Sequence, residues 1–181
     1  INSKYGNHPN NPYYNFMEHF IGTTASSTLS PYFGRTVNSG STTAITPAIG
    51  DNRMGVLSLN TGTTATGLAT LSTTSLLLIN FSNVVVGGYF ETGCSFRVPN
   101  LSTSTDTFGL VLGFGDNTTN LPVDGAYIYY TTDAITARVV SNSTMSSQAL
   151  SGLSTIIPNT DYICKVRVTK TSGTTYTAEF S

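Results

Sequence analysis

Apolar and polar residues alternate through the stretch from Phe108 to Tyr130, which is interrupted by a central loop rich in Asp, Asn, Gly and Pro. A period of two is typical of a β-strand with one face on a core. The pattern predicts two strands joined by a loop from Gly115 to Asp124, with Tyr127 and Tyr129 in the phase opposite to the core. The core phase contains Phe108, Leu110, Leu112, Phe114, Ala126, Ile128 and Tyr130.

The same alternation predicts further strands on either side of this stretch. One strand is expected from Tyr89 to Val98, with Glu91 facing solvent. Another is expected around Ala137, followed by a hairpin of two strands with a turn at Lys170–Gly173. The inward positions are Phe90, Thr92, Cys94, Phe96, Val98, Ile135, Ala137, Val139, Tyr162, Cys164, Val166, Val168, Tyr176, Ala178 and Phe180.

The N-terminal part of the chain has weaker patterns. Residues 1–12 carry Asn and Pro with almost nothing apolar, which predicts an extended tail or linker. The aromatic run Tyr13–Ile21 favours an edge strand over a helical turn. Segments rich in Ser, Thr and Gly, at Gly22–Ser30 and Thr36–Asp51, predict loops around a short aromatic piece, Tyr32–Arg35.

Two more strands are predicted before the central stretch. One begins at Val56 and leads into a Thr-rich turn bracketed by Gly62 and Gly67, after which the apolar pattern resumes at Leu68. The apolar run Leu76–Phe81 predicts the next strand.

Roughly ten short strands with Gly, Asn and Ser turns predict an all-β fold. We expect a two-sheet antiparallel sandwich with jelly-roll topology, formed by a single domain over residues 13–181. No repeat of fixed period occurs, which disfavours a propeller or a parallel β-helix.

The composition excludes two classes of partner. Charged residues make up only 9% of the chain and the net charge is −1, against a usual charged share of about 25%. The few Lys and Arg residues are scattered, so no basic stripe is present and we expect no nucleic-acid binding. No apolar run approaches the roughly 20 residues that span a bilayer, so we expect no membrane insertion.

The two cysteines, Cys94 and Cys164, both lie in the apolar phase of predicted strands. This placement favours two buried free thiols. A single disulfide between the strands is the alternative, since a bridge between core positions would suit an exported sandwich. Two cysteines alone, however, provide no framework from which to infer that pairing.

Candidate catalytic residues are sparse. Glu18, Glu91 and Glu179 have no second carboxylate nearby on the same strand face, so the paired carboxylates of glycosidases are missing. His8 and His19 precede the first secure strand and lack a nucleophile elbow or a metal-binding spacing. We expect no enzymatic activity, no metal site and no cofactor.

The predicted loop contains Asp116, Asn117 and Asp124, whose oxygens could converge on a calcium ion. The same residue types cap tight turns and tolerate positive φ, and this structural role is the favoured alternative.

Sugar binding requires exposed aromatic rings beside polar groups. Tyr127 and Tyr129 are the best-placed pair, with Arg138 as a partner. The alternative is that these tyrosines face a second sheet or another subunit, because tyrosine is a good strand former.

Several segments together resemble a concanavalin-like jelly-roll domain of bacteriophage tail-fibre and other virion proteins. They are NRMGVLSLNTGTTATGLATL (Asn52–Leu71), FRVPNLST, LGFGDN, DGAYIYY and NTDYICKVRVTKTSGTTYTAEF. The resemblance covers about Phe16 to Phe180 and includes the order of the segments. Members of this group usually continue past the last hairpin strand, so we expect either that the domain is cut at its C-terminus or that another segment completes the sandwich.

The resemblance implies a virion domain without catalysis, often trimeric, located on the surface of an extracellular particle. We therefore expect recognition of a host-surface glycan or receptor, together with contacts to other virion subunits. The alternatives are a purely structural capsid decoration or fibre module, and a secreted carbohydrate-binding module. The family has no single ligand site, so it assigns no binding residue here.

Overall fold

The structure is a computed structural model that describes residues 33–38, 41–49, 53–63, 67–73, 84–132, 134–150, 152–153 and 155–181. Within these ranges every regular element is a strand, and all strand pairs are antiparallel. The prediction of an all-β fold is confirmed. The predicted tail at residues 1–12 and the predicted strands Tyr13–Ile21 and Leu76–Phe81 lie outside the described residues.

The largest sheet has four strands in chain order: β6 (Leu110–Gly115), β7 (Gly125–Thr131), β8 (Ala134–Ser141) and β9 (Thr144–Ala149). Its strands β8 and β9 are joined by the two-residue turn Asn142–Ser143, in which both residues have positive φ. This is the type I′ geometry, whose twist matches that of the flanking strands.

A three-stranded sheet combines distant parts of the chain. Its order is β11 (Thr175–Phe180), β10 (Asp161–Ser172) and β5 (Tyr89–Arg97). The predicted hairpin is confirmed as β10 and β11, and β5 adds to the other side of β10. These strands are among the clearest alternating segments of the sequence.

Two further sheets have two strands each. One pairs β1 (Phe33–Asn38) with β4 (Leu68–Thr73), and the other pairs β2 (Thr42–Ile49) with β3 (Arg53–Asn60). The prediction of a loop over Thr36–Asp51 is wrong, because β2 lies within it. Thr and Ile are good strand formers, and backbone pairing with β3 outweighs the weak apolar pattern of this segment.

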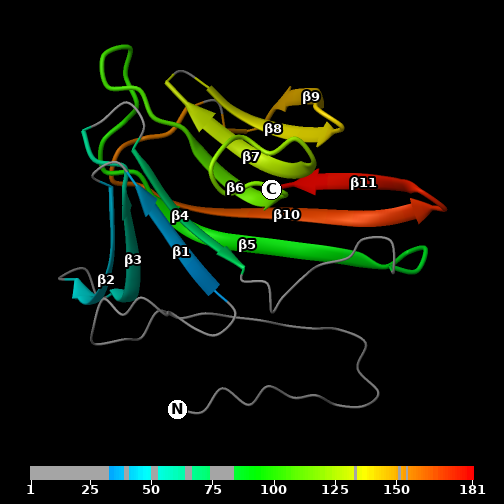
Figure 1. Cartoon of the computed structure of the whole chain (residues 1–181), viewed down its shortest axis with the longest axis horizontal. Helices are drawn as coiled ribbons and strands as arrows, with labels where there is room; N and C mark the ends of the chain where they lie inside the picture. Colours follow the sequence, from blue (N-terminus) through cyan, green and yellow to red (C-terminus); the bar gives the residue numbers. More distant parts are fainter. Residues whose placement is uncertain are drawn as a thin grey trace.

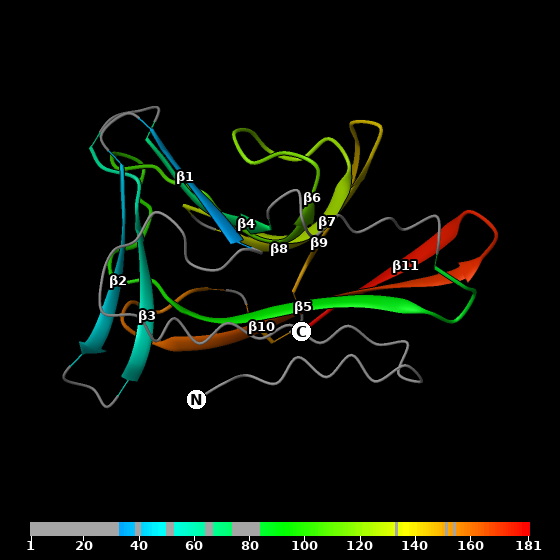
Figure 2. The same ribbon diagram turned by 60° about the horizontal axis from the view of Figure 1, so that its bottom comes forward.

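The core lies between the three-stranded and four-stranded sheets, which face each other in a sandwich-like arrangement (Figures 1 and 2). Strand β7 runs through the middle of its sheet, and its inward residues are buried as predicted. The buried residues of the core are Val98, Ala126, Ile128, Tyr130, Ile135, Ile156, Cys164, Val166 and Val168. Half-buried side chains complete it, including the predicted Phe108, Leu110, Leu112 and Phe114.

Candidate functional site

The four-stranded sheet has a second face that points away from the core, which we call the outer face. Alternation along each strand places its residues opposite those of the core. From β6, β7 and β8 the outer face receives Val111, Gly113, Tyr127, Tyr129, Thr136, Arg138 and Val140. The predicted sugar-binding residues therefore share one face.

Tyr127 is nevertheless only 1% exposed. It is paired directly with Gly113 of β6 and with Arg138 of β8. The expectation that Tyr127 offers an exposed ring is wrong. At 1% exposure the Tyr127 ring is covered on every side by other parts of the chain, so it packs beneath the surface instead of projecting from it.

Tyr129 and Arg138 form a stacked pair on the outer face. The Arg138 guanidinium carbon lies 4.0 Å from the centre of the Tyr129 ring, within the range of a cation–π contact. Arg138 Nε also donates a hydrogen bond of 3.2 Å to Thr136 Oγ1. At the edge of the ring, a Cβ on Gly109 would lie 3.0 Å from Cε2 and from the hydroxyl oxygen of Tyr129. Both groups are half-buried and held in place.

Arg138 is the one charged residue in strands β6 to β9. Among the described residues no carboxylate forms an ion pair with it. A guanidinium in this state has terminal N–H groups that can donate two parallel hydrogen bonds to an incoming carboxylate. The outer face therefore presents one oriented cation on a neutral surface.

The predicted loop acids have local structural roles. Asp116 Oδ1 accepts hydrogen bonds from the backbone N–H groups of Val123 and Asp124, at 3.0 and 3.2 Å. Asp124 Oδ1 accepts one of 2.7 Å from the N–H of Asn142. These contacts close the loop and fix it to the β8–β9 turn.

Asn117 acts in the same way within the loop. Its Oδ1 accepts hydrogen bonds from the backbone N–H groups of Thr119 and Asn120, at 2.9 and 3.1 Å. This is the turn-capping role that was the alternative to calcium binding. In the described part of the chain, no group of three His, Cys, Asp or Glu residues could hold a metal ion. His8 and His19 lie outside that part.

The charged side chains of the other sheet pair with one another. Glu91 forms an ion pair with Arg167, in which Arg167 Nη2 lies 2.6 Å from Glu91 Oε2. The hydrogen bond that Arg167 donates to Glu91 raises the pKa of the guanidinium. Arg97 pairs with Asp161 through two contacts of 3.1 Å. The prediction that Glu91 faces solvent is confirmed. These pairs leave Arg138 distinct from the arginines of the three-stranded sheet.

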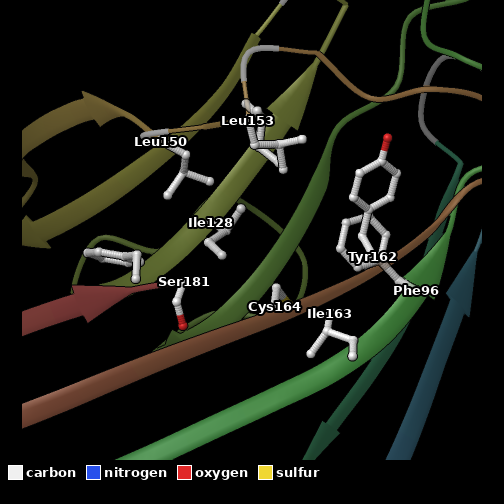
Figure 3. A pocket seen from close by; sticks show the side chains of 10 residues that line it. Phe96, Ile128, Leu150, Leu153, Tyr162, Ile163, Cys164 and Ser181 are labelled. Atoms are coloured by element: carbon white, nitrogen blue, oxygen red, sulfur yellow. The ribbon is translucent and has the colours of Figure 1, made fainter.

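An apolar pocket of about 110 Å³ lies between the sheets. Figure 3 shows side chains from both layers around it, including Ile128, Leu153 and Tyr162. The hydroxyl of Tyr162 accepts a hydrogen bond of 2.8 Å from the N–H of Ile157. This volume is well below the roughly 300 Å³ of pockets that take small organic ligands, so the pocket is a packing feature of the core.

The sequence did not indicate the glycines that support the site. Gly109 and Gly113 lie at or within a predicted strand, where glycine is unfavourable unless another group approaches closely. Glycine at these two strand positions was therefore the feature of the sequence that could have indicated a close approach of a neighbouring group.

No protein-family model, curated protein or solved structure matches the chain. Among the described residues, no helix is long and apolar enough to cross a membrane.

Proposed function

We propose that this chain is a non-enzymatic virion domain of the phage-fibre type, with jelly-roll topology, that binds a host-surface glycan. The observation that carries the proposal is the Tyr129–Arg138 pair on the outer face. The guanidinium carbon of Arg138 lies 4.0 Å from the centre of the Tyr129 ring. Arg138 has no acidic partner among the described residues, and β6 to β9 contain no other charged residue.

The geometry favours a glycan that contains an acidic sugar. Arg138 covers one face of the Tyr129 ring, and the ring edge beside the hydroxyl lies against Gly109, so a neutral pyranose would have to compete with the arginine for that face. A sugar carboxylate would instead accept hydrogen bonds from the guanidinium, while neighbouring sugar hydroxyls would meet the hydroxyls of Thr136 and Tyr129.

The shallow surface around Arg138 also suits multivalent binding, in which several copies of the domain bind at once. The outer face has a single cation and no deep pocket among the described residues, which predicts weak binding by one domain. Display of several copies on a fibre would raise the avidity by about 10²–10⁴ without new contacts. The resemblance to trimeric virion domains agrees with this arrangement.

The test is binding of the domain, clustered on a multivalent carrier, to an array that holds acidic glycans beside their neutral counterparts. We expect saturable binding to acidic glycans, and loss of at least tenfold in apparent affinity for Arg138→Gln. Lys165→Gln is the matched control, because it removes the same charge from the other sheet. This control should bind like the wild type.

Equal binding by the wild type and Arg138→Gln would reject the outer face as the glycan site. Absence of binding to glycans and to intact bacterial cells, with circular dichroism showing a folded protein, would reject glycan recognition. The alternative of a purely structural virion module would then be favoured.

A further inference from the structure

The two cysteines of the chain lie side by side across two neighbouring strands. Cys94 of β5 and Cys164 of β10 are directly paired in the register, although 70 positions separate them in sequence. Their Sγ atoms are 3.4 Å apart. Cys164 is buried as predicted, whereas Cys94 is exposed, so the prediction of two buried thiols is wrong for Cys94.

The backbone geometry of this pair is compatible with a disulfide. Directly opposed residues of antiparallel strands have Cα atoms about 4.5–5.5 Å apart. A disulfide requires a Cα separation of about 4.4–6.8 Å and an S–S bond of about 2.05 Å. Rotation of the two side chains is sufficient to bring the sulfurs together.

The thiols also influence each other chemically. A hydrogen bond from Cys94 lowers the pKa of the Cys164 thiol from 9.0 to about 7, against the opposing effect of burial. The same hydrogen bond raises the pKa of Cys94. The pair therefore loses its first proton from Cys164 near neutral pH, and Cys94 keeps the remaining proton in the hydrogen bond.

We propose that Cys94 and Cys164 are a redox modification site that forms a cross-strand disulfide on reaction with a low-molecular-weight disulfide such as oxidised glutathione. This proposal is independent of glycan binding, since both cysteines lie on the other sheet. It assigns a role to a residue pair that the strand pattern alone left open between free thiols and a bridge.

Exposure decides the order of the reaction. The Cys164 thiolate accepts the proton of Cys94, and the exposed Cys94 sulfur attacks one sulfur of oxidised glutathione. The glutathione S–S bond breaks, a mixed disulfide forms on Cys94, and one glutathione thiolate leaves. Cys164 then gives up its proton, attacks the Cys94 sulfur and releases the second glutathione. Two protein thiols are oxidised, and one glutathione disulfide is reduced to two thiols.

The test is incubation of the folded, reduced protein with excess oxidised glutathione. We expect both free thiols to disappear, the intact mass to fall by two hydrogens, and a non-reducing digest to contain one cross-linked peptide pair. Closure of a 70-residue loop predicts a melting temperature higher by about 10 °C, reversed by dithiothreitol. Persistence of two titratable thiols, or glutathione retained on Cys94 as the end product, would overturn the proposal.

Serine variants test the order of steps. Cys164→Ser should stop at the mixed disulfide on Cys94, because the resolving sulfur is missing. Cys94→Ser should leave the buried Cys164 without glutathione. In the wild type, the rate should increase as the pH rises through about 7, since the Cys164 thiolate is needed to take the proton from the attacking Cys94. Faster modification of Cys164 than of Cys94 would contradict this order. The loss of two hydrogens is measured on the wild-type protein, so it tests disulfide formation even if a serine variant does not fold.

Discussion

At the scale of single residues, two glycines lie close to the tyrosines of β7. Gly113 is opposite Tyr127, and a Cβ on Gly113 would lie 2.8 Å from the Tyr127 Cα. Gly109 lies at the edge of the Tyr129 ring, where a Cβ would come within 3.0 Å of the hydroxyl. Close approach of a neighbouring group therefore accounts for glycine at both positions, despite its low strand propensity.

Replacement of Gly113 by Ala should destabilise the protein by about 2–4 kcal/mol, through backbone strain and overpacking. A Cβ at this position would lie 2.6 Å from the carbonyl oxygen of Ala126 and 2.8 Å from Cα of Tyr127, and the φ angle is 148°. Urea denaturation followed by circular dichroism measures the change. Gly173→Ala is the control, because nothing lies within 4 Å of its Cβ position. Equal midpoints for the two variants would contradict the close approach at Gly113.

The sequence predicted part of the candidate site. It identified Tyr129 and Arg138 on one strand face, because alternation determines which side chains share a face. It did not separate Tyr127 from Tyr129, since the burial of Tyr127 depends on coverage by other parts of the chain, which the alternation along one strand does not reveal. For Asp116 it left calcium binding and loop capping open, and the hydrogen bonds of this residue correspond to capping.

At the scale of elements, the apolar pattern predicted the strands that border the core, together with β3 and β4, and missed β2 and β9. Strands β5, β7, β10 and β11 agree with prediction because burial of one face fixes their pattern. Strand β9, with the sequence TMSSQA, is exposed along its whole length and carries no such signal. It forms because a tight turn returns the chain alongside β8, a cause that lies in backbone geometry.

Ser143→Gly should stabilise the protein by about 0.5–1 kcal/mol. Ser143 has a φ of 63° in the β8–β9 turn, a conformation that costs a residue with a Cβ about 1 kcal/mol and costs glycine little. Asn followed by Gly is also the preferred sequence of a type I′ turn. Thermal unfolding gives the difference.

The matched control for that turn is Ser147→Gly, in the exposed strand β9. The same substitution there should destabilise the protein by about 0.5–1 kcal/mol, because glycine loses more conformational entropy in a strand. If both variants shifted stability in the same direction, the turn geometry would not be the cause.

At the scale of the whole molecule, charge is divided unequally between the two larger sheets. The three-stranded sheet carries cross-strand ion pairs on the side away from the core, formed by Glu91 with Arg167 and by Arg97 with Asp161. Exposed pairs of this kind contribute little to stability, about 0–1 kcal/mol each. Their consequence is electrostatic, since Arg97, Lys165 and Arg167 are compensated locally, whereas Arg138 has no ion pair among the described residues.

This division predicts a shallow salt dependence for binding of an acidic oligosaccharide. One exposed ion pair contributes up to about 1 kcal/mol, so raising the salt from about 0.01 M to about 1 M should weaken binding by no more than about fivefold. Titration of a monovalent oligosaccharide by nuclear magnetic resonance avoids the amplification that clustering brings. Arg138→Gln should bind more weakly and independently of salt. If the wild-type affinity fell about 100-fold over this salt range, several cations would have to bind the sugar together. Strands β6 to β9 contain one cation, so such a result would indicate a site near Lys165 and Arg167 on the other sheet.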